Sequence, residues 1–151
     1  NKKKKKCRSQ KLRKNLPLKK RRFNVAIIQQ NLEKLEISAA VASASVSATA
    51  TSSAIDLKDF DGDVLLVLNC AAGTGSSPTL DVKVQDSDET GGTYGDLSGA
   101  AFTQVTTSAS LQTLEVNKDE CKRFIKLVQT VGGSSPVFLY GISLVGAKKY
   151  G

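Results

Sequence analysis

Residues with the types and spacing needed for catalysis are scarce in this sequence of 151 residues. It contains no histidine, so the commonest general base and the commonest zinc ligand are both missing. Residues 73–76 (GTGS) lack the Gly-Lys pair that completes a phosphate-binding loop. Cys121 lies beside Lys122 and Arg123, which would lower its thiol pKa, but a cysteine without a histidine is a poor nucleophile. We therefore expect no enzyme activity and no cofactor.

Two acidic clusters bring oxygen ligands together at short spacing. One lies within residues 56–63, and the other consists of Asp86, Asp88 and Thr90. The second has the opening pattern of a calcium-binding loop, but Leu97 stands where an EF-hand needs its bidentate glutamate. The EF-hand motif therefore fails. A looser calcium site at these three residues stays open beside the simpler interpretation, solvated turn residues.

A concentration of lysine and arginine at the N-terminal end is the strongest signal in the sequence. Residues 1–24 carry 13 bases and no acid; the other residues carry 9 bases and 14 acids, and 9 − 14 = −5. Self-repulsion keeps such a segment extended until it meets counter-charge. We expect an extended basic arm that binds a polyanion, such as packaged nucleic acid or an acidic protein surface, with strong salt dependence. A solvated tail that only aids solubility is the alternative. The bases are Lys2, Lys3, Lys4, Lys5, Lys6, Arg8, Lys11, Arg13, Lys14, Lys19, Lys20, Arg21 and Arg22.

The three cysteines, Cys7, Cys70 and Cys121, are too few and too far apart for a disulfide scaffold or a CxxC metal site. Cys70 and Cys121 both border predicted strands, which favours buried free thiols. A bridge between these two stays open.

From residue 55 onward, short β-rich runs alternate with turn signals at intervals of roughly ten residues, which is typical of an all-β sandwich or barrel. The run at 63–69 is nearly all apolar, so we expect a strand covered on both faces. The alternation of Leu80, Val82 and Val84 with polar residues indicates a half-buried strand. The predicted strands are 63–69, 79–85, 102–106, 111–116, 123–131 and 137–145, and the predicted loops are 71–78, 86–96, 117–120 and 132–136. The fold class is therefore an antiparallel β-sandwich, immunoglobulin-like or jelly-roll-like.

The segments that precede residue 55 are less regular. Val25, Ile28, Leu32 and Leu35 lie on one face of a helix, although an extended structure for 25–28 stays open. Residues 37–54 are low-complexity Ala, Ser, Val and Thr, and predict an extended strand or linker that would order best on another subunit. We expect a basic arm at 1–24, an extended or partly helical linker arm at 25–54 and a β-sandwich domain at 55–151.

No apolar stretch approaches the ~20 residues that a transmembrane helix needs. The longest, 137–147, contains Gly141 and Ser143. A signal peptide fits badly, because 23–28 is short for its apolar core. A transit peptide would be rich in arginine, whereas this segment is dominated by lysine. We expect no membrane association.

The chain from about residue 55 to residue 150 resembles the small decoration, or cement, proteins on the heads of tailed bacteriophages. Residues 55–65 (IDLKDFDGDVL), 72–75 (AGTG) and 78–83 (PTLDVK) carry the resemblance, with 101–106 (AFTQVT) and the ending 143–150 (SLVGAKKY). The resemblance implies a β-sandwich in the virion, often a homotrimer, that clamps neighbouring subunits of the major capsid protein after assembly in the host cytoplasm. It implies no enzyme activity.

Other structural roles stay open at this point. A coat protein of a small icosahedral virus pairs a shell domain with a basic arm that contacts the packaged nucleic acid, but about 95 residues is short for a jelly-roll shell domain. A phage tail component, or a protein that binds nucleic acid through the arm alone, would also account for the charge pattern.

Overall fold

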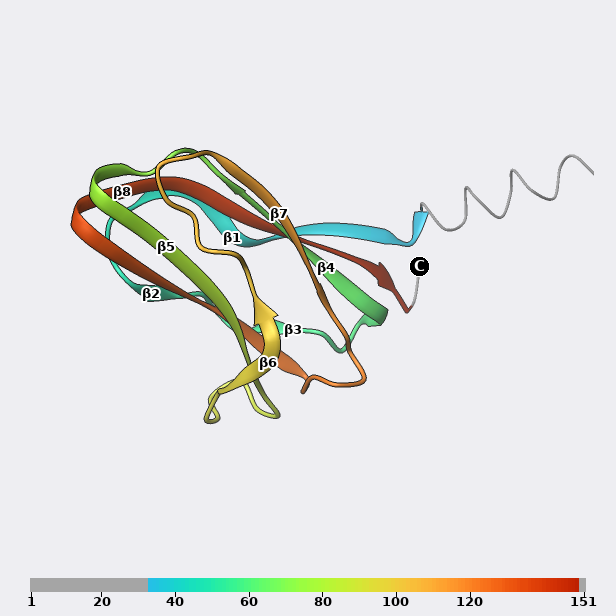
Figure 1. Ribbon diagram of the computed structural model, residues 1–151. Helices are drawn as coiled ribbons and strands as arrows, with labels where there is room; N and C mark the ends of the chain where they lie inside the picture. Colours follow the sequence, from blue (N-terminus) through green and yellow to red (C-terminus); the bar gives the residue numbers. More distant parts are fainter. Residues whose placement is uncertain (1–32, 150–151) are drawn as a thin grey trace, which may run out of the picture. The chain divides into compact units, whose positions relative to one another are not determined.

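The computed structural model describes residues 33–149, and these residues form an all-β, antiparallel structure (Figure 1). Every pairing between its named strands is antiparallel. The strands are β1 (Leu35–Val46), β2 (Ala50–Thr51), β3 (Ile55–Asp56), β4 (Phe60–Cys70), β5 (Thr74–Ser87), β6 (Gly95–Ala101), β7 (Ser110–Val116) and β8 (Phe124–Lys148).

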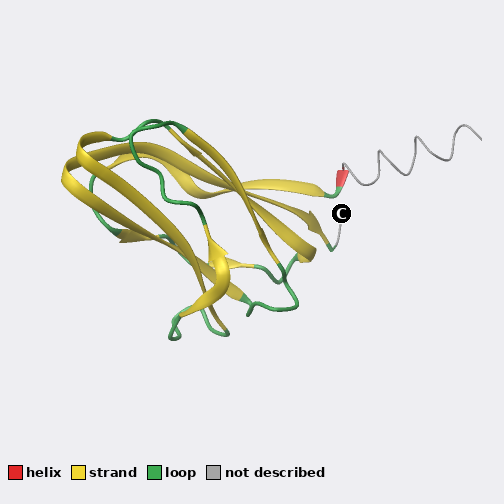
Figure 2. Ribbon diagram, viewed as in Figure 1, coloured by secondary structure: helices red, strands yellow, loops and turns green. Residues whose placement is uncertain are grey.

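The 25-residue strand β8 organises the domain, because its two halves belong to two sheets (Figure 2). Its C-terminal half lies between β1 and β4, and β7 pairs with the other side of β4; we call this sheet A. Its N-terminal half lies between β5 on one side and β2 and β3 on the other, and β6 pairs with β5; we call this sheet B. The most separated parts of the sequence, β1 and β8, are therefore neighbours.

The bend between the two sheets lies in segments that we predicted as loops, 71–78 and 132–136. Only the start of the first is a loop; the rest of both segments is strand, and Ser76 pairs with Ser134. The backbones approach closely: a Cβ on Gly75 would lie 2.5 Å from the Ser135 carbonyl oxygen. Gly75 and Gly133 both have positive φ, which bends the paired strands together. The two similar Gly/Ser/Pro segments are thus partners in one β-corner.

A core of aliphatic and aromatic side chains fills the space between the inner faces of the sheets. Phe138 is fully buried in it, as are Leu66, Leu127 and Val84. Tyr140 and Gln129, from the two halves of β8, meet within it: the Tyr140 hydroxyl donates to the Gln129 side-chain oxygen. The Gln129 amide donates in turn to the Ala48 carbonyl at 2.9 Å. Burial raises the pKa of Tyr140 to about 12, so this phenol remains a donor.

Most of the strands predicted from residue 55 onward are confirmed, with small differences at their ends. The expected strand at 102–106 is wrong. Its backbone makes only scattered bonds to β5, including a single bridge between Val105 and Leu80, and the Gln112 side chain binds Thr103 at both its N–H and its carbonyl. The β-structure expected there occurs just before it, as β6. The predicted loop at 86–96 is shorter, because its ends belong to β5 and β6.

The predicted linker at 25–54 also needs correction where it is described. Leu35, which we expected on the face of a helix, belongs to β1, whereas the other three residues of that face, Val25, Ile28 and Leu32, lie outside the described residues. Residues 37–46 are extended as expected, but they pair with β8 of the same chain, and Val41 and Val46 pack against the core. The compact unit accordingly begins at Glu33 rather than at residue 55. Cross-strand pairing with β8 supplies the burial that this segment lacks by itself.

Candidate interaction surfaces

The three candidate calcium ligands do not converge in the structure. Asp86 is buried, and its carboxylate accepts the Lys122 backbone N–H at 3.0 Å. Asp88 is exposed and lies 3.6 Å from the Lys122 ammonium, while the Thr90 carbonyl accepts the Tyr94 hydroxyl. Within residues 33–149 no group of three or more metal-ligating side chains gathers. The geometry therefore favours turn residues, with Asp86 joining the end of β5 to the start of β8.

The two described cysteines are free and do not form a bridge with each other. Burial raises the pKa of the Cys70 thiol. Burial also raises the pKa of Cys121, and the Asp86 carboxylate adds to this effect. The expectation of a lowered pKa at Cys121 is therefore wrong, because burial and a nearby acid outweigh the cations beside it in sequence. Neither thiol has the environment of a nucleophile.

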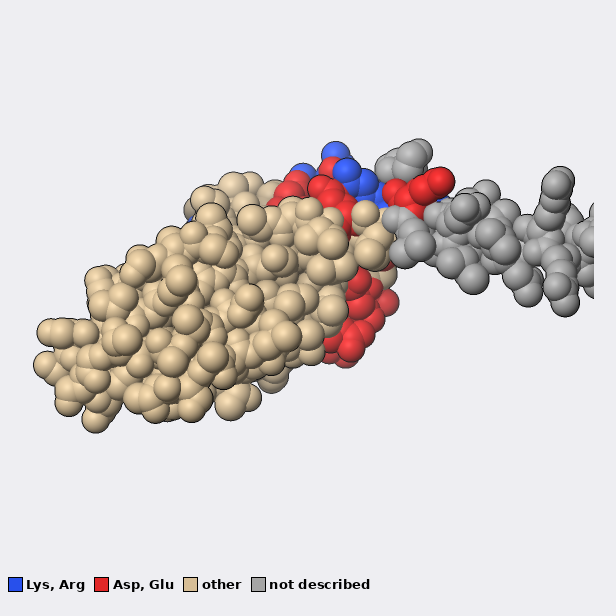
Figure 3. Space-filling view, turned by 90° about the horizontal axis from the view of Figure 1, so that it is seen from above, with Lys and Arg blue, Asp and Glu red and all other residues tan. Residues whose placement is uncertain are grey.

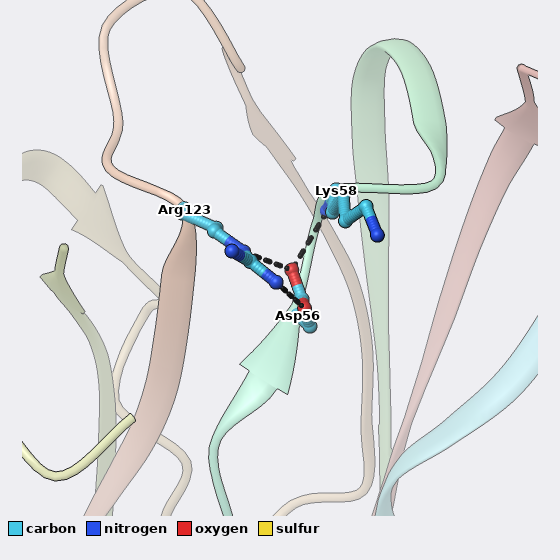
Figure 4. Close-up of polar contacts among 3 residues, drawn as sticks. All are labelled: Asp56, Lys58 and Arg123. Atoms are coloured by element: carbon cyan, nitrogen blue, oxygen red, sulfur yellow. Dashed lines mark hydrogen bonds and ion pairs between the residues drawn. The ribbon is translucent and has the colours of Figure 1, made fainter. Parts of the chain in front are cut away.

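An ion pair joins β3 to the start of β8 at the charged end of sheet B (Figure 4). The Arg123 Nη2 and Nε groups donate to the two Asp56 carboxylate oxygens at 2.6 and 3.0 Å. The Lys58 backbone N–H donates to the same carboxylate at 2.9 Å. The bond from Arg123 holds the pKa of Asp56 below its ordinary value of 3.8, and the Lys58 bond adds to the effect. The arrangement is a surface clamp on the two-residue strand β3.

We expect Asp56→Asn to lower the melting temperature slightly at neutral pH, since both partners are substantially exposed. Because the folded-state pKa is lowered, the contribution is present above the ordinary pKa and is lost as pH falls through the lowered value. Melting curves of wild type and variant between neutral and strongly acid pH should therefore converge at the acid end. Asp59→Asn is the control, because Asp59 is exposed and makes no ion pair within the described residues. A difference that persisted unchanged in acid would contradict the assignment.

The outer face of sheet B is covered by polar side chains that bind one another. Asp96 accepts bonds from Lys83 and Gln85, both at 2.7 Å. The bond from Lys83, with that from Gln85, lowers the pKa of Asp96. The Lys126 ammonium lies 4.0 Å from the centre of the Tyr94 ring. This face is therefore well adapted to water.

The outer face of sheet A is different, because large exposed hydrophobic side chains lie on it among a few polar ones, such as Glu115 opposite Leu65. Opposed residues of paired strands share a face, and the pairs Ile37–Val145 and Val145–Leu65 cross the sheet from β1 to β4. Leu139 is 57% exposed and Leu111 is 73% exposed on this face. Six large hydrophobic side chains are exposed within residues 33–149. Five lie on this side of sheet A, and Val137 follows on β8, where it pairs with Thr74 of sheet B: Leu35, Ile37, Leu65, Leu111, Leu139 and Val137. We call these six residues the apolar face.

The expectation that the strand at 63–69 is covered on both faces is therefore not met by the residues that the structure describes. Leu66 and Leu68 are buried, but Leu65 is 38% exposed. Two features of the sequence indicate the apolar face: the continuous apolar run at 63–69, and Leu139, which is apolar although its neighbours Phe138 and Tyr140 point to the core. An apolar run of this kind does not reveal whether its second covering comes from the same chain.

Charge is distributed unevenly over the described residues. Four segments lack Asp, Glu, Lys and Arg altogether: 37–55, 64–80, 97–114 and 127–147. On the face of the molecule in Figure 3, the charged side chains gather at one end and the remainder is uncharged. Since interface centres are depleted of charge, this uncharged surface is compatible with close contact to another protein.

The 13 bases of the predicted arm, Lys2 to Arg22, lie outside the described residues. No helix among the described residues is long and apolar enough to cross a membrane. No protein-family model matches the sequence, and no curated protein matches it.

Proposed function

We propose that this chain is a structural protein of a virion that binds the assembled capsid and stabilises it by clamping neighbouring subunits of the major capsid protein. The observation that carries the proposal is the apolar face on sheet A, beside surface that lacks charge. Large hydrophobic side chains exposed together on one side of a domain favour a protein–protein contact there. The absence of histidine and of a converged metal cluster among the described residues gives no competing chemistry.

The area of the outer face of sheet A is close to that of one side of a protein–protein interface. Four strands about 4.8 Å apart, each roughly ten residues long at ~3.3 Å per residue, present roughly 600 Å². A stable interface buries about 800 Å² per partner. Sheet A and the loops at its ends therefore supply most of one standard interface, and the proposed arm, repeated around a particle, would add weak contacts that combine by multivalency.

We propose further that the fold is a sandwich of the jelly-roll type. Counting each half of β8 separately gives two four-stranded sheets, with the orders β1-β8-β4-β7 and β2/β3-β8-β5-β6. This is the strand order of an eight-stranded jelly roll in which the last two strands are continuous. Jelly rolls are frequent in viral shells, which supports the proposal by analogy of fold only.

The same strand order, together with the basic segment at 1–24, favours a second candidate. In this role the chain is an icosahedral coat protein, or a tail component, whose arm contacts the packaged nucleic acid. The two candidates differ in the target of the arm. The cement role requires acidic capsid surface, whereas the coat role requires nucleic acid.

Co-sedimentation of the full chain tests these candidates. The chain is mixed with empty capsids of the virus that encodes it, with unassembled capsid protein, or with DNA, each across a salt series. We expect binding to empty capsids that survives at high salt, because apolar contact is not screened, and little binding to unassembled subunits. Binding to DNA alone, lost steeply with salt, would contradict the cement role and support the second candidate.

A further inference from the structure

Strand β1 leaves one edge of sheet A open. Among residues 33–149 it pairs with β8 and with no strand on its other side. The other outer strands are protected by devices that natural sheets use: β2 and β3 have two residues each, while the seven-residue strands β6 and β7 carry Asp96 and Glu115. In contrast, β1 has 12 residues, no proline and no charge after Glu36. The unprotected part of this edge is the regular segment from Leu35 to Ala39, because Glu36 is paired with Lys148 and the register shifts come only after Ala39.

The regular part of β1 presents free backbone groups in a known pattern. The Lys148 N–H donates to the Lys34 carbonyl at 2.8 Å, and the register continues without a shift from Leu35 to Ala39. Alternate residues of an antiparallel strand face the same neighbour, so Glu36 and Ser38 bind β8 together with Lys34. The N–H and C=O groups of Leu35, Ile37 and Ala39 therefore point away from β8. Register shifts after Ala39 disturb the rest of the edge.

This edge is complementary to itself. In an antiparallel pair centred on Ile37, Ile37 lies opposite Ile37 of a second copy and Leu35 lies opposite Ala39, all on the apolar side. The nearest charge, Glu36, is neutralised by Lys148 at 2.6 Å within its own chain. No like charges are brought opposite each other, and every free N–H and C=O from Leu35 to Ala39 gains a partner.

We propose that β1 pairs antiparallel with β1 of a second copy of this chain, about a two-fold axis at Ile37, to join two sheets A into one continuous sheet. Such a contact is isologous and closes at two copies, so it does not propagate into fibres. The proposal does not depend on capsid binding. A strand from a different protein could bind the same backbone groups without a two-fold axis. A trimer of this chain would need a different contact, because an isologous contact closes at two copies.

Sedimentation equilibrium of the full chain at physiological salt tests this pairing. A second run of the wild type at high salt checks that its association does not depend on the basic segment, because high salt suppresses such association. The variants are Ile37→Lys, Ile37→Glu and their equimolar mixture. Ile37 is 68% exposed, so each variant should fold, and melting curves check this. Leu111→Lys, at an exposed position of β7 in the same sheet, is the matched control.

We expect wild type and Leu111→Lys to reach the mass of two copies. Each Ile37 variant should associate roughly tenfold more weakly or worse, because like charges then lie opposite each other, and the mixture should recover the dimer. A wild type that stays monomeric at its highest soluble concentration, a three-copy mass, or a Lys variant that dimerises normally would overturn the proposal. Failure of the mixture to recover, with both variants folded and monomeric, would also overturn it and favour a strand from another protein.

Discussion

Phe138→Ala should destabilise the domain by about 3–5 kcal/mol, the usual cost of removing a buried aromatic side chain. Phe138 is fully buried, and its ring fills the space beside Gly73, where a Cβ would lie 2.3 Å from the ring edge. No small neighbouring movement can fill the cavity, because β8 at this point is held by β1 and is close to the β-corner. Chemical denaturation of wild type and variant measures the difference.

Leu139→Ala is the matched control for that measurement. Leu139 is adjacent in sequence, but it is 57% exposed on the apolar face. Truncation there should cost less than about 1 kcal/mol, because most of the side chain is already in water. Similar losses at both positions would mean that β8 does not present these two residues to opposite sides.

Leu139→Asp should weaken binding to empty capsids about 100-fold, and it should leave the melting temperature nearly unchanged. A central apolar anchor contributes on the order of 2–4 kcal/mol to an interface, and a carboxylate placed there must also be desolvated. The free domain tolerates the change because position 139 faces solvent. Co-sedimentation across a range of capsid concentrations measures the affinity.

Thr130→Asp is the control for this second prediction, because Thr130 is exposed on β8 at the outer face of sheet B. It adds the same charge to the same strand on the polar face, and capsid binding should not change. An equal loss of capsid affinity in both variants would indicate a general effect of the added negative charge. An unchanged affinity of Leu139→Asp would show that the apolar face does not bind the capsid.

The strands of the domain could be predicted where burial alternates along a single chain segment. Leu80, Val82 and Val84 are buried while Asp81 is exposed, as their period of two requires. The β-corner could not be predicted in this way, because Gly75 and Gly133 are turn residues by composition and become strand only through pairing with each other. Local propensity carries no information about such a partner.

The pairing of β1 with β8 could not be predicted either, because it also depends on a distant partner. Residues 37–54 are too small and polar to indicate a core strand, and their partner lies about 100 residues later in β8. The apolar face could be predicted only in part. The apolar run at 63–69 indicates burial on two sides, but it does not show whether the second covering comes from this chain or from another protein.

Hydroxyl-radical footprinting of the full chain, free and bound to empty capsids, tests the central claim most directly. The side chains to compare are Leu139, Leu111 and Leu65 on sheet A against Lys126 and Tyr94 on sheet B. We expect the leucines to become protected on the capsid, while the sheet B residues stay reactive. Protection of the sheet B residues, with the leucines as reactive as in the free chain, would contradict it.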